Sequence, residues 1–226
     1  MGLDEDLEPV IWDPRRDQHL VVFGEEQSGK STLLRNVIRQ ISARHGLDSA
    51  RFIVFDSQRQ LLDLPYLPDQ LIASATNGRD AAGIISANLD RLQSRLPGPA
   101  MTREQIARRE WWGSPADIYI VVDNYERLAA ATPLNSLIPL LDHAADIALH
   151  LVIARQVRGA SRAVFEGVYA KLKDVGTPGL VLSGPETEGA VYGRTRVTDR
   201  PPGRGAWIPR RGPELIMQAT LEPQEW

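Results

Sequence analysis

The sequence contains no cysteine, has few aromatic residues and has no long uninterrupted hydrophobic run. Without cysteine, disulfide bonds and thiolate metal sites are excluded, and a reducing compartment is compatible with the chain. No apolar stretch approaches the roughly 18 residues of a transmembrane helix, and the acidic residues 4–6 are unlike the start of a signal peptide. The net charge of −3 argues against broad electrostatic binding of nucleic acid.

The remaining composition is that of a globular protein, with 226 residues, 42% of them hydrophobic and 24% charged. This length favours one α/β domain spanning residues 1–226. Two stretches are locally basic, residues 103–109 and 194–211. We interpret their arginines as solvated surface side chains, with phosphate or subunit contacts as the alternative.

One glycine-rich loop follows the pattern Gly, any four residues, Gly-Lys-Ser/Thr. It consists of Gly24, Glu25, Glu26, Gln27, Ser28, Gly29, Lys30 and Ser31. The loop follows an apolar run and precedes apolar residues at helical spacing, as a phosphate-binding loop requires. Its backbone N–H groups converge on phosphate oxygens, while Lys30 reaches the β- and γ-phosphates, Ser31 binds Mg²⁺ and Thr32 touches the α-phosphate. The sequence therefore predicts a site for a nucleoside triphosphate and Mg²⁺.

A second part of this site is predicted where the β-branched run 118–122 ends in Asp123. A carboxylate at the end of a neighbouring buried strand is typical of the magnesium side of phosphate-loop enzymes. Motors of this kind commonly carry Glu next, to polarise the attacking water, but here the residue is Asn124. An amide can orient water but cannot accept its proton, so we expect binding with slow hydrolysis. Glu126 is expected to lie deeper in the loop, out of reach.

Gln156 ends a further apolar run, residues 150–156. Because ligands collect at the carboxyl edge of open α/β sheets, its amide is a candidate sensor of the γ-phosphate. A loop glutamine without this role is the alternative.

The alternation of apolar runs and amphipathic stretches predicts a mainly parallel sheet flanked by helices. Strands are expected at residues 20–23, 52–55, 118–122, 150–154 and 180–182. Helices are expected at residues 30–44, 79–96, 103–111, 133–142 and 161–173, the third opened by a capping box of Thr102 and Gln105. Residues 205–208 and 215–219 are expected to form a β-hairpin at one edge of the sheet.

The order of phosphate loop, Asp-ended strand and His-Leu-Val-Ile-Ala-x-Gln strand resembles the FtsK/SpoIIIE branch of RecA-like hexameric ATPases. Three later segments are similar to the C-terminal ATPase module of the EccC family of type VII (ESX) secretion motors. They are Arg-Gly-Ala-Ser-Arg-Ala-Val-Phe at 158–165, Leu-Ser-Gly-Pro-Glu-Thr-Glu-Gly at 182–189 and Arg-Pro-Pro-Gly-Arg-Gly-Ala at 200–206. The resemblance covers nearly the whole chain.

This resemblance implies a RecA-like fold that binds ATP, as one module among several in a hexameric motor. Other parts of such a motor anchor it to the membrane, which would place this module in the cytoplasm at the inner face. The family implies capture of the C-terminal signal of WXG100-type secreted proteins and a commonly degenerate nucleotide site, with which Asn124 agrees. The alternatives from other classes are a DNA-translocating motor and a small-molecule kinase with residues 103–109 as its lid.

Overall fold

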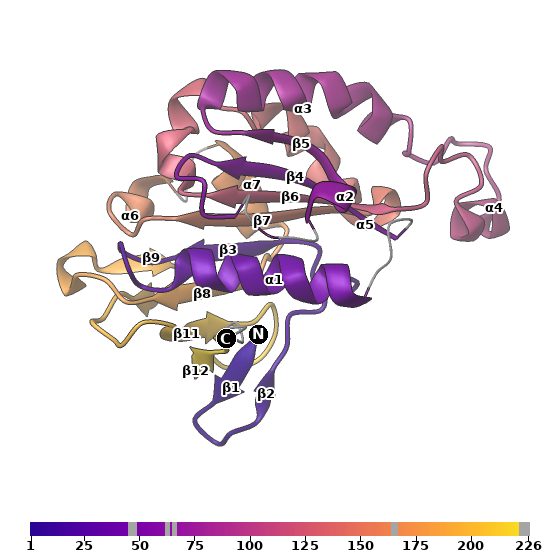
Figure 1. Ribbon diagram of the computed structural model, residues 1–226. Coiled ribbons are helices and arrows are strands. Elements are labelled where there is room, and N and C mark those ends of the chain that lie inside the picture. The colour runs from indigo at the N-terminus through magenta and orange to yellow at the C-terminus, as the bar shows by residue number, and fades with distance from the viewer. Residues whose placement is uncertain (45–48, 62–63, 65–66, 164–166, 222–226) are drawn as a thin grey trace.

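The computed structural model describes residues 1–44, 49–61, 64, 67–163 and 167–221. Its strands form a ten-stranded sheet in the order β2-β1-β12-β11-β8-β3-β7-β6-β4-β5, with a separate pair of short strands, β9 and β10. Helices cover both faces of the large sheet (Figure 1). The predicted α/β class is confirmed.

Six of these strands form the parallel centre of the sheet. They are β3 (Leu20–Phe23), β4 (Ala50–Asp56), β5 (Leu71–Ala75), β6 (Asp117–Asp123), β7 (Leu149–Arg155) and β8 (Gly179–Leu182). Five of them were predicted, because their continuous apolar runs are typical of strands buried on both faces. The sequence of β5, Leu-Ile-Ala-Ser-Ala, includes alanine and serine, which are not enriched in strands, and it was missed.

Antiparallel strands extend the sheet beyond β8. The predicted hairpin of β11 (Arg204–Ile208) and β12 (Leu215–Ala219) is confirmed and pairs with β8 through β11. The edge itself is formed by an N-terminal hairpin that was not predicted, β1 (Gly2–Asp4) and β2 (Pro9–Val10), of which β1 pairs with β12. Strands β1 and β12, which are far apart in the sequence, therefore lie side by side (Figure 1). The short pair consists of β9 (Ala190–Tyr192) and β10 (Thr195–Arg196).

The helices agree with the predicted positions to different degrees. Helix α1 (Lys30–Arg44) was predicted to the residue, α3 (Gly78–Gln93) begins one residue early, and α4 (Arg103–Arg108) carries the predicted capping box. The helix expected at 133–142 is a 3₁₀ helix, Asn135–His143, with Pro139 inside it. The remaining helices are α2 (Leu67–Gln70), α5 (Ala144–Ile147), α6 (Ala160–Ala163), α7 (Gly167–Asp174) and the 3₁₀ turns Tyr125–Arg127, Ala129–Ala131 and Glu186–Glu188.

The single helix expected at 161–173 corresponds to α6 and α7, and residues 164–166 between them lie outside the described residues. The helix expected at 103–111 ends early, because Arg109 adopts the left-handed conformation with φ of 52°.

Alternate residues of the buried strands contribute to two separate cores. On one face, Val22 and Val54 pack with Leu34 and Ile38 of α1. On the other, Val21 and Ile53 pack with residues of α3, α7 and the 3₁₀ helix Asn135–His143. Each fully buried aliphatic or Phe side chain contributes about 1.5–3 kcal/mol. The first of these cores fixes α1, and with it the loop that ends at its first residue, against the centre of the sheet.

A buried arginine ties the opposite, amino-terminal edge of the sheet together. Arg95 is 3% exposed and donates to the carbonyl oxygens of Ser114, Ala116 and Ile147 at 2.9–3.1 Å. Its guanidinium also stacks on the Trp112 ring at 4.4 Å, and burial lowers its pKa to about 10. Arg95 thus supplies donors to three carbonyl groups at the starts of β6 and β7.

Candidate nucleotide-binding site

The glycine-rich loop joins β3 to α1 at the carboxyl edge of the parallel strands. It is held by backbone bonds from Gly24 N–H to Arg155 O (3.2 Å) and from Glu25 N–H to Ser183 O (2.8 Å). A Cβ on Gly24 would lie 2.3 Å from Ser28 Oγ, and Gly29 has φ of +99°. Both glycines are therefore required by the loop's own geometry, and the first turn of α1 begins immediately after it.

Lys30 is 5% exposed and its Nζ donates to the carbonyl oxygen of Glu25, in the same loop, at 2.8 Å. Burial lowers the pKa of Lys30, and the carboxylates of Asp123 and Glu126 oppose this shift. The ammonium is thus desolvated and held by a single carbonyl in the loop. Phosphate oxygens placed there would give it a stronger, charge-assisted hydrogen bond.

Ser31 and Asp123, predicted as the two metal-side residues, are in direct contact. Ser31 Oγ donates to Asp123 Oδ2 at 2.6 Å, and Asp123 is fully buried. Its second oxygen, Oδ1, has no hydrogen-bond partner among the described residues. Burial raises the pKa of Asp123, while the hydrogen bond from Ser31 lowers it. An unpartnered buried carboxylate oxygen beside a hydroxyl group fits a divalent cation with oxygen ligands.

Asn124 follows β6 directly, is 5% exposed and adopts the left-handed conformation with φ of 50°. Its Nδ2 donates to Gln58 Oε1 at 3.1 Å, and both residues line the same pocket. The amide is therefore engaged across the pocket wall. It offers no group that could take a proton from water at neutral pH.

Gln156 lies against the glycine-rich loop, since its Nε2 donates to Glu26 Oε1 at 3.4 Å. Its backbone N–H donates to Glu126 Oε2 at 3.0 Å. The other oxygen of Glu126 is buried without a hydrogen-bond partner in the described part of the chain. Gln156 and Glu126 thus form one polar group behind the loop. Arg158 adds an ion pair with Glu25 at 3.3 Å.

A pocket of about 430 Å³ opens beside these residues. Of the residues predicted for the site, Glu26, Gln27, Gly29, Lys30, Ser31, Thr32 and Asn124 line it. Gly24, Glu25, Ser28, Asp123 and Gln156 belong to the surrounding framework and do not line it.

A further wall of the pocket was missed by sequence reasoning. It consists of residues 202–203 and 219–221. Gly203 N–H donates to Ser28 O at 2.8 Å, and Ala219 N–H donates to Gly203 O at 2.8 Å, so this wall is bonded directly to the loop. Residues 202–203 belong to the segment 200–206, which sequence marked only as similar to the EccC family, although its Pro-Pro-Gly turn, in which Gly203 has φ of +80°, signals unusual backbone; residues 219–221 carry no motif.

A phosphate loop between strand and helix, a Ser–Asp pair beside it and a pocket at the carboxyl edge of a parallel sheet define a P-loop ATPase domain. The family model of the FtsK/SpoIIIE family matches residues 1–164. The chain belongs to this family.

The curated relatives of the chain include ESX secretion proteins. The chain is 40% identical over 225 residues to the ESX secretion system protein EccC of Thermomonospora curvata, covering 98% of this chain and 17% of that protein. It is 38% identical to ESX-4 secretion system protein EccC4 of Mycobacterium tuberculosis, and the match covers 99% of this chain and 18% of that protein. The chain thus spans less than a fifth of the length of these relatives.

Solved structures of EccC are similar to the chain as well. The cytoplasmic domain of the type VII secretion ATPase EccC of Thermomonospora curvata superposes with a TM-score of 0.92 at 38% identity, covering 99% of this chain and 26% of that one. A structure of ATPases 2 and 3 of the same EccC in complex with a signal sequence peptide has a TM-score of 0.91 at 38% identity. The match covers 99% of this chain and 40% of that one. The likeness therefore extends over the whole fold.

Within the described ranges, no helix is both long enough and apolar enough to span a bilayer.

Proposed function

We propose that this chain is an ATP- and Mg²⁺-binding ATPase module of a type VII secretion motor, with slow hydrolysis. The observation that carries the proposal is the combination of a complete phosphate loop, including the Ser31–Asp123 pair, with Asn124 at the position of the usual base. Binding and hydrolysis are therefore separate properties of this site.

In this proposal the loop N–H groups and Lys30 hold the phosphates, and Ser31 and Asp123 hold the Mg²⁺ ion that neutralises phosphate charge. Lys30 exchanges the carbonyl of Glu25 for phosphate oxygens. Residues 202–203 and 219–221, which line the same pocket as the loop, hold the base. Without a proton acceptor at Asn124, the chemical step loses the roughly 10²–10⁴-fold that a positioned base contributes.

We further propose that the module recognises the C-terminal signal of WXG100-type secreted proteins. The similar EccC structure that is described as a complex with a signal sequence peptide supports this assignment. Because the relatives are several times longer, we place the chain as one of several ATPase modules in a hexameric motor. Other parts of that motor would hold it at the cytoplasmic face of the membrane.

The test measures ATP affinity and single-turnover hydrolysis for the wild type, Asn124→Glu and Asn124→Gln. The two variants are nearly isosteric, and only Glu adds a proton acceptor. We expect micromolar or tighter ATP binding by the wild type, slow turnover, and an increase of about 100-fold in Asn124→Glu alone. Rapid hydrolysis by the wild type would refute the assignment of a degenerate site.

A DNA-translocating motor of the FtsK type is the alternative function. It predicts salt-dependent DNA binding that stimulates ATP hydrolysis, and the same turnover assay with added duplex DNA distinguishes the two functions.

A further inference from the structure

The loop that follows β4, residues 57–60, brings a glutamine to the nucleotide pocket. The last residue of β4, Asp56, lies opposite Asp123 of β6 in the parallel register. Gln58 lines the nucleotide pocket together with Lys30 and Ser31. Because the carboxyl ends of neighbouring parallel strands meet at one edge of a sheet, Gln58 lies at the same edge as the phosphate loop.

The backbone of this loop is fixed by Asp56, which is fully buried. Its Oδ1 accepts a hydrogen bond from Gln58 N–H at 3.2 Å, and its Oδ2 accepts one from Leu61 N–H at 2.6 Å. Arg35 of α1 donates from Nη1 to Gln60 O at 2.7 Å. An aspartate that binds the backbone N–H groups after it stabilises a turn. Gln58 is therefore presented by a turn that is tied both to the sheet and to α1.

Gln58 and Asn124 form a pair of amides, because Asn124 Nδ2 donates to Gln58 Oε1 at 3.1 Å. This bond leaves two groups unused, the acceptor Asn124 Oδ1 and the donor Gln58 Nε2. Neither has a hydrogen-bond partner among the described residues. Gln58 is exposed, and both residues line the nucleotide pocket. The pair therefore offers one acceptor and one donor to a molecule in the pocket.

A water molecule matches these two groups. Its hydrogens suit the acceptor, and one of its lone pairs suits the donor, which leaves the other lone pair for attack on phosphorus. Asn124 directly follows Asp123, which is bonded to Ser31 on the metal side of the site. Glutamine side chains position the attacking water in this manner in GTPases.

We propose that Gln58, held by Asn124, orients the attacking water during ATP hydrolysis. Asn124 Oδ1 accepts a hydrogen bond from the water, and Gln58 Nε2 donates one to its oxygen. The water oxygen bonds to the γ-phosphorus as the bond from that phosphorus to the bridging oxygen breaks. ADP leaves with the electron pair, and the water proton passes to a γ-phosphate oxygen.

Turnover by this route is slow, because neither amide accepts the proton, but it exceeds the uncatalysed rate, because the water is oriented. This inference rests on the proposed function, since it names a further residue for the same site.

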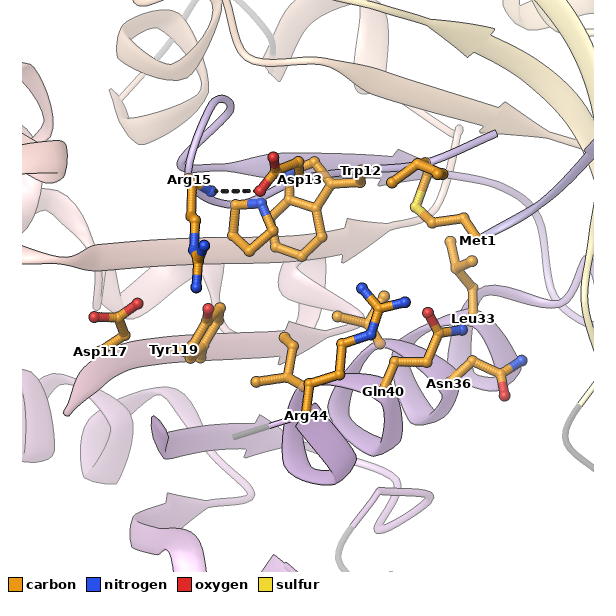
Figure 2. A pocket seen from close by; sticks show the side chains of 14 residues that line it. Met1, Trp12, Asp13, Arg15, Leu33, Asn36, Gln40, Arg44, Asp117 and Tyr119 are labelled. Carbon is orange, nitrogen blue, oxygen red and sulfur yellow. Dashed lines mark hydrogen bonds between the residues drawn. The ribbon is translucent and has the colours of Figure 1, made fainter. Parts of the chain in front are cut away.

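A second pocket, of about 450 Å³, lies between the N-terminal segment and α1 and supplies a control (Figure 2). Its walls carry two guanidinium groups, of Arg15 and Arg44, and two carboxylates, of Asp13 and Asp117, so their charge favours no ligand of one sign. Gln40 of α1 lines this pocket and not the nucleotide pocket. It therefore offers the same side chain in a different pocket of the same fold.

The experiment measures single-turnover hydrolysis of ATP, with protein in excess and Mg²⁺ present, in the wild type and three variants. Gln58→Leu removes the amide at nearly constant volume, and we expect at least about tenfold slower hydrolysis. Gln58→Glu keeps an oxygen for Asn124 and adds a proton acceptor, so hydrolysis should be at least about tenfold faster than in the wild type. Gln40→Leu, the control, should stay within about twofold of the wild-type rate.

Binding measurements separate the orientation of water from damage to the pocket. Mg·ADP with aluminium fluoride mimics the phosphoryl group in the transition state, in which the water is bound. Gln58→Leu should bind this mimic at least about tenfold more weakly than the wild type does, and Mg·ATP within about twofold. Equal losses for both ligands would show a distorted pocket and overturn the role of Gln58. Circular dichroism confirms that each variant is folded.

Asn124→Gly tests the pair, because glycine tolerates the φ of 50° that Asn124 adopts. This variant alone should also slow hydrolysis at least about tenfold. Since the two amides act as one unit, Asn124→Gly combined with Gln58→Leu should hydrolyse ATP within about twofold of the slower single variant. Effects that multiply would refute the pairing.

The outcomes separate the role of Gln58 from the proposed function. A wild-type rate in Gln58→Leu, or no acceleration in Gln58→Glu, overturns the role of Gln58 while ATP binding stands. Hydrolysis by the wild type that is no faster than the uncatalysed reaction overturns this role as well. Absence of Mg·ATP binding by the wild type overturns the proposed function itself.

Discussion

The wall formed by residues 202–203 is the basis of our most specific prediction, for the change Gly203→Ala. Gly203 has φ of +80°, and an added Cβ would lie 2.8 Å from Gln218 Nε2. A residue other than glycine in this region of backbone conformation costs about 1–2 kcal/mol. The Gln218 side chain can swing away, but it then loses its hydrogen bond to Pro202 O, worth about 0.5–1.5 kcal/mol. We expect a loss of about 2–3 kcal/mol in the free energy of unfolding.

The same change should weaken ATP binding. Relief of the strain moves the N–H of Gly203, which donates to Ser28 O inside the phosphate loop at 2.8 Å. Loss of one such bond is worth about 1 kcal/mol, so we expect ATP affinity to fall about five- to tenfold. Urea unfolding gives the stability, and titration with a fluorescent ATP analogue gives the affinity.

Gly212→Ala is the matched control. Gly212 has φ of +107°, and the nearest atom to an added Cβ is Pro209 Cγ at 3.9 Å. This variant should therefore lose only the backbone contribution, about 1–2 kcal/mol of unfolding free energy, and bind ATP as the wild type does. The reasoning is refuted if Gly203→Ala loses stability but keeps wild-type ATP affinity, because the wall would then not support the loop.

Two further predictions concern buried groups outside the nucleotide site. His19 is buried, and desolvation, followed by the nearby His150, lowers its pKa to about 3. As pH falls below 6.5, His19 binds a proton in the unfolded chain but not in the folded chain. The free energy of unfolding should therefore fall by up to about 1.4 kcal/mol for each pH unit between pH 6.5 and 3. Urea unfolding of His19→Asn should show a shallower pH dependence, and an equal slope would contradict this pKa. Arg95→Met should lower the free energy of unfolding by about 3–5 kcal/mol, because three carbonyl groups lose a charged hydrogen-bond donor. ATP affinity should be unchanged, and a loss under about 1 kcal/mol in urea unfolding would show that water replaces the guanidinium.

The elements that were predicted correctly from the sequence are those whose own residues form a recognisable pattern. Strands such as β3 and β6 are continuous apolar runs, and α1 has apolar residues at helical spacing after a glycine-rich loop. Asp123 could be placed beside Ser31 because the carboxyl ends of parallel strands meet at one edge of a sheet. These inferences need only short stretches of sequence.

The elements that sequence missed depend on contacts between distant residues. Strand β1 has only three residues, Gly-Leu-Asp, whose strand propensity is low. It is stabilised by its pairing with β12. The wall of residues 202–203 and 219–221 joins the pocket through bonds to Ser28 and Gly203, which no periodicity announces. In the basic stretch 103–109 all positions but two, Ile106 and Arg109, are exposed, in line with its interpretation as a solvated surface, whereas Arg109 forms an ion pair with Asp117 at 3.5 Å.

The pairing of β1 with β12 has a consequence for how the molecule folds. Gly2 lies opposite Ala219, so β1, which already forms a local hairpin with β2, joins the large sheet only through a strand that is distant in sequence. Closing so long a loop is a slow, late event in folding. Because residues 219–221 also complete the nucleotide pocket, ATP can bind fully only to chains whose last strand has docked. By mass action the nucleotide then favours molecules in which β12 has docked over molecules in which it has not, so ATP binding stabilises this late step of folding.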